Sequence, residues 1–276
     1  MQKLVASPLP KKLIQDNSDC LAAQVIKISL LTPSYNHADF IQRTIDSVLQ
    51  QQGDFELDYV VLDGGSTDAT TRILKGYGES LRWTSKADGG QIEALNHGLD
   101  AATGDVVGWL NSDDMLLPGA LQKVAEGFAQ NPQAVWLHGD CTIVDRDDKE
   151  IRQWVSAYKR YRARRYSRKK LLSSNFISQM TVFWKRTVMH KIGMLDSSLT
   201  LAFDYDYWLR LSKIADPIYV PSPLAAFRWY PTSKSGGNLR RQCQEDERVA
   251  RGHGLHGVGL WTKRFENWLR VTYLNK

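Results

Sequence analysis

The strongest constraint in this sequence is a regular alternation of short, apolar, β-rich runs with segments whose apolar residues recur at helical spacing. The apolar runs are Lys27–Thr32, Tyr59–Leu62, Leu81–Ser85 and Asp105–Leu110. Helical spacing follows them near 41–48, 67–75, 91–102 and 118–130. This alternation predicts an α/β fold with a mainly parallel central sheet and helices on both faces. Ligands of such sheets bind beyond the carboxyl ends of the strands, so we expect chemistry after Thr32, Leu62 and Leu110.

Two of these points carry loops suited to a nucleotide. The loop Thr32–Asn36 (TPSYN) closes the first run, and its backbone could cradle a base against the Tyr35 ring. The loop Asp63–Asp68 (DGGSTD) closes the second, where glycines allow close approach of a ligand and Asp63 could accept a hydrogen bond. In isolation, each loop is also explained as a tight turn with helix caps. Neither is a Walker phosphate loop or a GxGxxG fingerprint, which excludes both of those nucleotide-binding classes.

The third point carries adjacent carboxylates in Asn111-Ser112-Asp113-Asp114, directly after a strand. Two neighbouring negative charges at a strand end repel each other, and a bound cation is one reason to tolerate them. Hard oxygen ligands suit Mg²⁺ or Mn²⁺, which would also bind diphosphate oxygens. The alternative is an ordinary Asp-rich turn before the helix that begins near Pro118.

A fourth polar cluster lies far along the chain, in Phe203–Arg210 (FDYDYWLR). Asp204 precedes a helical pattern, so it is either the helix N-cap or a general base that takes a proton from an incoming hydroxyl. Arg210 follows Asp206 by four residues, which predicts a structural ion pair on one helix face.

Together these clusters resemble glycosyl transferase family 2, whose members have the GT-A fold. The resemblance rests on TPSYN, VLDGGSTD, DGGQIEALNHGL, GDVVGWLNSDD and FDYDYWLRL, in that order, and covers about residues 27–235. It implies an inverting, metal-dependent transferase that moves a sugar from a nucleoside diphosphate sugar, with UDP favoured, to a hydroxyl of a glycan or lipid-linked saccharide in polysaccharide biosynthesis. The alternative within the resemblance is a non-catalytic relative that only binds a nucleotide sugar.

The resemblance also implies roles for single residues. Asp204 matches the catalytic aspartate, and Asp113 and Asp114 match the acidic members of the metal motif, which would hold Mn²⁺ or Mg²⁺. The residues expected to contact the donor are Pro33, Tyr35, Asn36, Asp63, Asp88, Gln91, Asn111, Ser112, Asp113 and Arg228. Ser233 and Lys234 are further candidates for a phosphate contact.

Three positions depart from the family pattern. Phe203 stands where glutamate is common beside the base, which makes the expected acceptor pocket less acidic. Tyr230 falls where many relatives carry histidine, which puts a metal or diphosphate contact from that position in doubt. Asn111 replaces the usual first aspartate of the metal motif, and leaves two carboxylates.

The distribution of charge supports a division into a donor part and an acceptor part. Residues 1–157 hold 13 basic and 22 acidic side chains, whereas residues 158–276 hold 23 basic and 8 acidic ones. We expect an N-terminal extension (1–24), a catalytic domain (25–235) whose parts meet near 150, and a basic amphipathic helical region (236–276). The basic half would attract an anionic acceptor or the surface that carries it.

The basic half also raises the question of partners. The run Tyr158–Lys170 interleaves Tyr with Arg, as nucleic-acid-binding segments do, but the site-like clusters of the acidic half argue against nucleic acid. With the aromatic stripe Trp261, Phe265 and Trp268, the run suits a peripheral membrane contact. The alternatives for the stripe are the core or a homodimer contact. The absence of an apolar signal segment and of CxxC pairs predicts a cytoplasmic protein, at the inner face of the membrane if it binds one.

Overall fold

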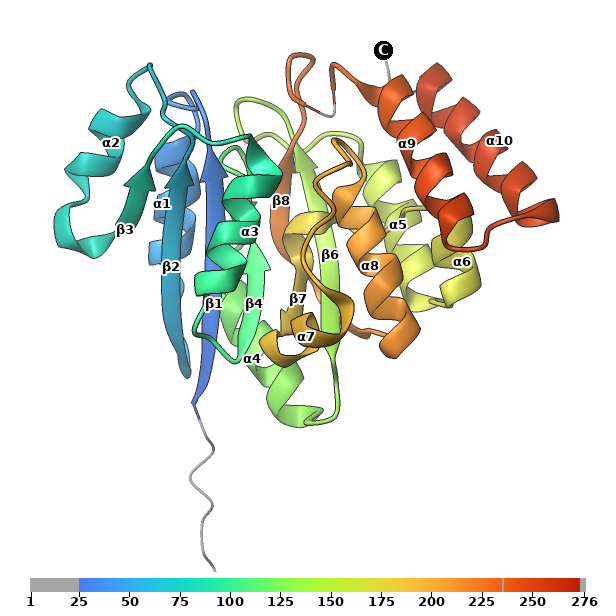
Figure 1. The fold of residues 1–276 in the computed structure, drawn as a ribbon, viewed down its shortest axis with the longest axis horizontal. Coiled ribbons are helices and arrows are strands. Elements are labelled where there is room, and N and C mark those ends of the chain that lie inside the picture. Colours follow the sequence, from blue (N-terminus) through green and yellow to red (C-terminus); the bar gives the residue numbers. More distant parts are fainter. Residues whose placement is uncertain (1–24, 235, 274–276) are drawn as a thin grey trace, which may run out of the picture.

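The computed structural model describes residues 25–234 and 236–273, and the expected extension at 1–24 lies outside them. The strands are β1 (Ile26–Ser34), β2 (Phe55–Asp63), β3 (Arg82–Ser85), β4 (Val106–Trp109), β5 (Met115–Leu116), β6 (Trp136–Val144), β7 (Val182–Lys185) and β8 (Ile218–Arg228). Within the described chain they form one sheet in the order β3-β2-β1-β4-β7-β6-β8-β5 (Figure 1).

The four strands predicted from the sequence form the parallel part of this sheet. β1 pairs in parallel with β2 and with β4, and β2 pairs in parallel with β3. The register sets Ser34 opposite Asp63 and Leu31 opposite Trp109, so the carboxyl ends of these strands meet at one edge. β7 runs antiparallel to both β4 and β6, and joins the parallel part to β6 and β8. The predicted α/β sheet is confirmed, and the less regular second half of the sequence extends it.

Helices cover both faces of the sheet (Figure 1). They are α1 (Ile41–Leu49), α2 (Thr70–Gly76), α3 (Gln91–Ala101), α4 (Ala120–Gln130), α5 (Gln153–Arg164), α6 (Arg168–Ser173), α7 (Met189–Ile192), α8 (Phe203–Ile214), α9 (Leu239–Gly252) and α10 (Gly257–Tyr273). Short 3₁₀ turns occupy Gly78–Ser80, Gln179–Thr181 and Arg186–Val188. Apolar residues of α1 and α4 pack in one core cluster, and those of α3 and α8 pack in the other. The sheet is therefore buried on both faces.

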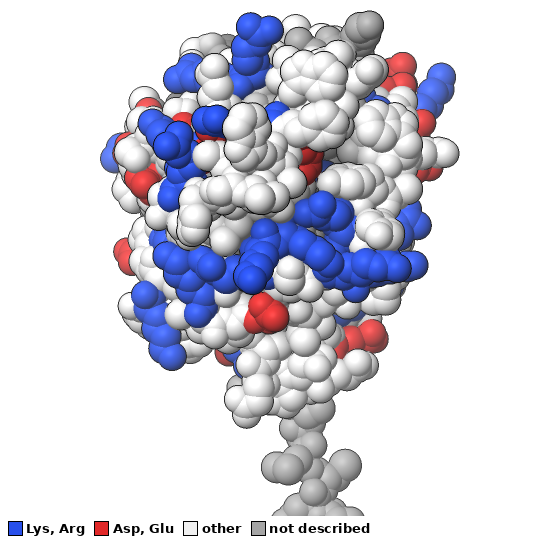
Figure 2. Space-filling model, turned by 90° about the vertical axis from the view of Figure 1, so that its right-hand side faces the viewer, with Lys and Arg blue, Asp and Glu red and all other residues white. Residues whose placement is uncertain are grey.

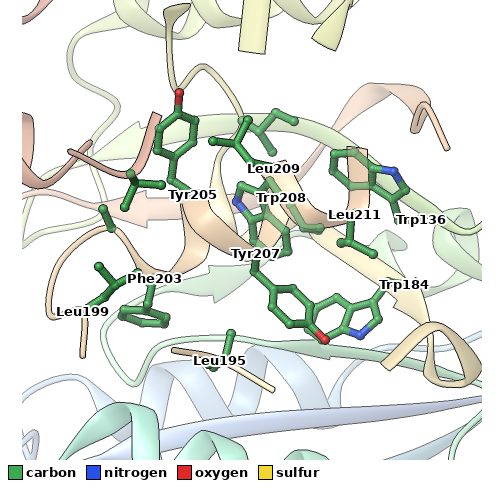
Figure 3. Packing of buried hydrophobic residues seen from close by; sticks show 14 of the residues in the cluster. Trp136, Trp184, Leu195, Leu199, Phe203, Tyr205, Tyr207, Trp208, Leu209 and Leu211 are labelled. Carbon is green, nitrogen blue, oxygen red and sulfur yellow. The ribbon is translucent and has the colours of Figure 1, made fainter. Parts of the chain in front are cut away.

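A dense aromatic core holds α8 against the sheet (Figure 3). Trp208 of α8 stacks on Trp109 at a ring-centroid distance of 5.5 Å and on Trp136 at 6.3 Å. Trp184 of β7 packs against Tyr207 at 5.2 Å. Each large apolar side chain removed from water stabilises the fold by roughly 1.5–3 kcal/mol. This packing fixes the position of the first turn of α8.

The C-terminal region forms the expected helices, α9 and α10, which pack on each other, on α8 and on α6. Lys263 of α10 is buried, and its ammonium group lies 3.3 Å from the hydroxyl of Tyr205. The basic run at 158–170 lies on α5 and α6. None of the helices in the described part of the chain is long and apolar enough to cross a membrane.

Candidate active site

A cavity of about 1370 Å³ opens beyond the carboxyl ends of β1, β2 and β4. It continues past the first turn of α8 to α5 and α10, which supply its outer walls. The predicted site residues that line it are Pro33, Tyr35, Asp88, Gln91, Asn111, Ser112, Asp113 and Asp204. The predicted site residues that do not line it are Asn36, Asp63, Asp114 and Arg228. Residues separated by up to 171 positions in the sequence thus share one cavity.

Asp63 shapes the loop after β2 and does not line the cavity. Its buried carboxylate accepts hydrogen bonds from the backbone N–H groups of Gly65 (3.2 Å) and Ser66 (2.9 Å) and from the hydroxyls of Ser66 (2.5 Å) and Ser85 (2.6 Å). Gly65 has a φ of +82°, and a Cβ there would lie 3.1 Å from the backbone nitrogen of Ala87. Gly64 and Gly65 of this loop line the cavity, and the contact between Asp63 and a base stays a prediction.

Asn36 ties the loop after β1 to the loop after β2. Its backbone is left-handed (φ +52°), and its side-chain oxygen accepts hydrogen bonds from the N–H groups of Thr67 (2.8 Å) and Asp68 (3.3 Å). Asp68 in turn accepts from the N–H of Ala38 (3.0 Å). These bonds leave the exposed ring of Tyr35 and the buried Pro33 to face the cavity. Asn36 holds the two loops together and does not line the cavity, and its contact with the donor stays a prediction.

The two carboxylates after β4 point in different directions. Asp113 lines the cavity and accepts a hydrogen bond from the hydroxyl of Tyr230 at 3.0 Å. Asp114 is fully buried and accepts from the backbone N–H of Arg228 (2.9 Å) and the amide of Asn111 (3.2 Å). Burial and the neighbouring Asp113 raise the pKa of Asp114 well above its ordinary value. Of the two carboxylates predicted to hold a metal, Asp113 lines the cavity and Asp114 does not.

The oxygen atoms that Asp113 presents to the cavity suit a divalent ion whose other ligands come from a bound diphosphate and from water. In the described residues, no group of three or more His, Cys, Asp and Glu side chains could enclose a metal. Asp113 offers a carboxylate to the cavity, and the Tyr230 hydroxyl takes the position where a histidine was expected. Mg²⁺ commonly binds one or two carboxylates, substrate phosphates and water rather than a complete protein cage. Asp113 is thus the residue that would hold such an ion.

Arg228 lies behind the cavity rather than in it. Its buried guanidinium donates hydrogen bonds to the backbone carbonyls of Asp113 and Asp145, both at 2.9 Å, and pairs with Asp148 at 2.5 Å. Its donors face these protein groups, and Arg228 does not line the cavity. It supports the backbone that presents Asp113.

Gln91, the first residue of α3, connects the loop after β4 to the loop after β8. Its amide donates to the side-chain oxygen of Asn111 at 2.8 Å, and its oxygen accepts from the ammonium group of Lys234 at 2.7 Å. Lys234 also lies 5.3 Å from the ring centroid of Phe203. This places a cation over the cavity between Asp113 and α8. Asp88 lines the cavity beside Gln91 and accepts from the N–H of Gly90 at 2.8 Å.

Asp204 is the second residue of α8, and its side chain lines the cavity. It is not the N-cap, which is Ala202 and makes no side-chain cap bond. Glu245 of α9 instead accepts the N–H groups of Thr200, Leu201 and Ala202 at 2.5–3.2 Å. Burial raises the pKa of Asp204 to about 7, with a further contribution from the negative charge of Asp246. A carboxyl group with this pKa can accept a proton near neutral pH.

The surroundings of Asp204 combine an apolar wall with cations. Phe203 stacks on Trp109 at 6.0 Å, and both rings line the cavity. Lys159 of α5 also lines it, and its ammonium group donates to the Ser178 hydroxyl at 3.1 Å. The positive charges of Lys159 and Lys234 oppose the rise in the pKa of Asp204. Asp206 makes the predicted pair with Arg210 at 2.8 Å, and His253 lies 2.7 Å from its other oxygen.

Several residues at the site carry no local signal in the sequence. Gln179 donates to the carbonyl of Trp109 at 2.7 Å and accepts from Asn111 at 3.1 Å. His37 lies 2.6 Å from the Ser112 hydroxyl. Gln179 and Lys159 come from segments outside the site motifs, and the packing of distant elements brings them to the cavity. His37 directly follows the loop Thr32–Asn36 and also lines the cavity, whereas Glu245 does not line it and contacts the turn before α8.

Comparison with known proteins identifies relatives in sequence and in fold. The chain is 27% identical over 68% of its length to an uncharacterized glycosyltransferase of Rickettsia typhi, and spans 59% of that protein. Its fold matches the structure of Staphylococcus aureus TarS 1–349 in complex with UDP-GlcNAc with a TM-score of 0.65, at 17% identity, over 90% of this chain and 73% of that 1–349 chain. A mannosyltransferase of Pyrobaculum calidifontis in complex with GDP-Man and Mn²⁺ matches with a TM-score of 0.60, at 17% identity, over 91% of this chain and 71% of that one.

These likenesses confirm the GT-A fold expected from the motifs. The sequence model of the family described as glycosyl transferase family 2 matches residues 29–191. That match spans more than half of the chain and takes in the loops after β1, β2 and β4 that build the cavity. The chain therefore belongs to glycosyl transferase family 2.

Proposed function

We propose that this chain transfers a sugar from a nucleoside diphosphate sugar, with UDP as the favoured nucleotide, to a hydroxyl group of a saccharide or lipid-linked acceptor, with inversion at the anomeric carbon. The observation that carries the proposal is that Asp113 and Asp204 line the same cavity. The complexes of TarS with UDP-GlcNAc and of the archaeal mannosyltransferase with GDP-Man support a nucleotide sugar as donor.

Asp204 acts as the general base in this proposal. Its carboxylate takes the proton of the acceptor hydroxyl as that oxygen attacks the anomeric carbon. The bond from this carbon to the diphosphate oxygen breaks, and the electron pair leaves with the nucleoside diphosphate. A pKa of about 7 leaves the carboxylate substantially ionised at neutral pH and basic enough to hold the proton.

Asp113 and Lys234 serve the leaving group. Asp113 would hold Mn²⁺ or Mg²⁺ together with diphosphate oxygens, and the ion would neutralise negative charge on the departing group. The ammonium group of Lys234 is bound by the neutral amide of Gln91, so its charge can be directed to a phosphate. The ring of Tyr35 offers a surface for the base, and the open end of the cavity between α5 and α10 would receive the acceptor.

The test compares Asp204→Asn with Asp216→Asn, which makes the same charge change at an exposed position just beyond α8. We expect Asp204→Asn to abolish transfer while calorimetry with UDP and Mn²⁺ still gives the affinity of the unmodified chain. Asp216→Asn should retain both transfer and UDP binding. Loss of UDP affinity in Asp204→Asn would contradict the role of a base. UDP binding without any transfer by the unmodified chain, over a panel of sugars and acceptors, would favour the non-catalytic alternative.

A further inference from the structure

Exposed aromatic side chains gather on two helices at the outer end of the cavity. Six of them expose more than half of their surface, and we call them the aromatic rim: Trp154 and Tyr161 on α5, and Trp261, Phe265, Trp268 and Tyr273 on α10. Phe265 and Trp268 stack on each other at a ring-centroid distance of 5.9 Å. Exposed aromatic residues gathered in this way mark an interaction surface.

The aromatic rim borders the open end of the cavity from both sides. Trp154 of α5 and Phe265 and Tyr273 of α10 line the cavity as well as being exposed. Behind them, Lys263 on the opposite side of α10 is buried against Tyr205, which fixes how this helix is turned. The rim is therefore held in place by the core, and whatever covers it also meets the cavity.

A basic surface adjoins the aromatic rim on α5 and α6. Its exposed members are Arg160, Arg164, Arg165, Lys169 and Lys170, and we call them the basic band. Figure 2 looks onto the side of the molecule formed by α5, α6, α9 and α10, and shows a nearly continuous band of Lys and Arg below a largely uncharged area. The guanidinium of Arg165 lies 4.3 Å from the ring centroid of Tyr161, which joins the two surfaces.

The charges of the basic band are largely uncompensated. Arg160 lies 3.8 Å from Asp140, and the other four members form no ion pair with any residue in 25–234 or 236–273. The segment 158–170 contains no acidic residue. Like charges at this density repel each other, so a partner with negative charge would stabilise the surface.

We propose that the aromatic rim and the basic band together dock the protein on an anionic lipid bilayer, with the open end of the cavity turned toward the lipid. Trp and Tyr side chains favour the boundary between lipid headgroups and acyl chains. Lys and Arg beside them bind anionic headgroups. The proposed contact uses exposed side chains of α5, α6 and α10, as in proteins that lie on a membrane surface.

Charge also decides against a second copy of this chain as the occupant. A two-fold contact places the same patch of both copies face to face, so the basic band of one copy would approach that of the other. The same positive charges attract the headgroups of an anionic bilayer. A nucleic acid shares the negative charge and could stack on the aromatic residues, and the experiment separates it from lipid.

The experiment is co-sedimentation of the full chain with vesicles, without donor or acceptor, so that its outcome does not depend on the proposed function. We expect binding to vesicles that contain phosphatidylglycerol at low salt, and little binding to phosphatidylcholine alone. Trp261→Ala with Trp268→Ala should lower the partition coefficient on the order of tenfold for each tryptophan. Arg165→Glu with Lys169→Glu should remove the preference for anionic vesicles.

The matched control is Arg72→Glu with Lys75→Glu on α2, two exposed basic residues at the opposite end of the sheet (Figure 1). This control should bind vesicles as the unmodified chain does, and all variants should keep its melting temperature. Absence of binding to anionic vesicles at low salt would overturn the proposal, as would an equal loss in the control. Tight binding of a labelled oligonucleotide without vesicle binding, or a dimer in light scattering that both tryptophan changes dissociate, would also overturn it.

Discussion

Replacement of Asp204 by asparagine should stabilise the protein, and by more at higher pH. Burial, with the charge of Asp246, raises the pKa of Asp204 from its ordinary 3.8 to about 7. The folded chain therefore binds a proton more tightly than the unfolded chain between these values, and it loses stability as the pH rises through that window. Asparagine cannot ionise, so the variant does not incur this loss.

The size of the effect follows from the shift in pKa. One pKa unit corresponds to about 1.4 kcal/mol, so the raised pKa of Asp204 lowers the free energy of unfolding by about 4 kcal/mol near pH 7.5 and by about 2 kcal/mol near pH 5. The stability advantage of Asp204→Asn should therefore grow by about 2–3 kcal/mol between the two conditions. Any difference in packing between the two side chains is independent of pH and cancels in this comparison.

Urea unfolding at both pH values, followed by tryptophan fluorescence, measures the effect. Several tryptophans report on the core around α8, including Trp109, Trp184 and Trp208. Asp216→Asn, the exposed control, should follow the unmodified chain at both pH values. If the free-energy difference between Asp204→Asn and the unmodified chain were the same at pH 5 and pH 7.5, the raised pKa of Asp204 would be refuted.

Three further predictions test other parts of the site. EDTA should weaken UDP binding in calorimetry, and Mn²⁺ should restore it. The Asp113→Asn variant should bind UDP weakly even with Mn²⁺. Equal UDP affinities of the variant and the unmodified chain in Mn²⁺ would contradict a metal held by Asp113. Glu245→Ala should lower the free energy of unfolding by about 3 kcal/mol, because the N–H groups of Thr200, Leu201 and Ala202 lose their acceptor. A decrease of less than about 1 kcal/mol in urea unfolding would argue against this role of Glu245. Arg228→Met should lower the free energy of unfolding in urea by about 3 kcal/mol and leave the UDP affinity unchanged, since Arg228 faces buried carbonyls. Weaker UDP binding at an unchanged Tm would instead support a contact between Arg228 and phosphate.

The parallel half of the sheet and its polar edge could be predicted because their signals are local. Each strand there is a continuous apolar run followed by a polar loop, and the common direction of the strands brings these loops together. Asp113 and Asp204 both line the cavity, the first after the end of a strand and the second at the start of a helix, and their chemical roles stay predictions. The strands β6 and β8 were not predicted, because bulges and prolines interrupt their apolar residues.

The direction of individual polar side chains could not be predicted in the same way. Asp63, Asn36 and Arg228 match the expected pattern, yet each is satisfied by backbone groups of a loop whose path depends on tertiary packing. A sequence motif predicts that a polar residue lies at the end of a strand. It does not predict which neighbouring groups the side chain of that residue contacts. The same limit explains why Gln179 and Glu245, which lie outside any motif, contact the site or the turn before it.

The contact between Glu245 and the backbone at 200–202 has a consequence for how this protein can be divided. Although the motifs end before residue 236, the turn that carries Asp204 depends on a side chain from beyond that boundary. Lys263, still later in the sequence, contacts α8 through the hydroxyl of Tyr205. A chain shortened to its motif-bearing part would therefore keep the loops after β1, β2 and β4 but lose the contacts that hold the turn carrying Asp204. The smallest unit able to fold an intact site includes α9 and α10.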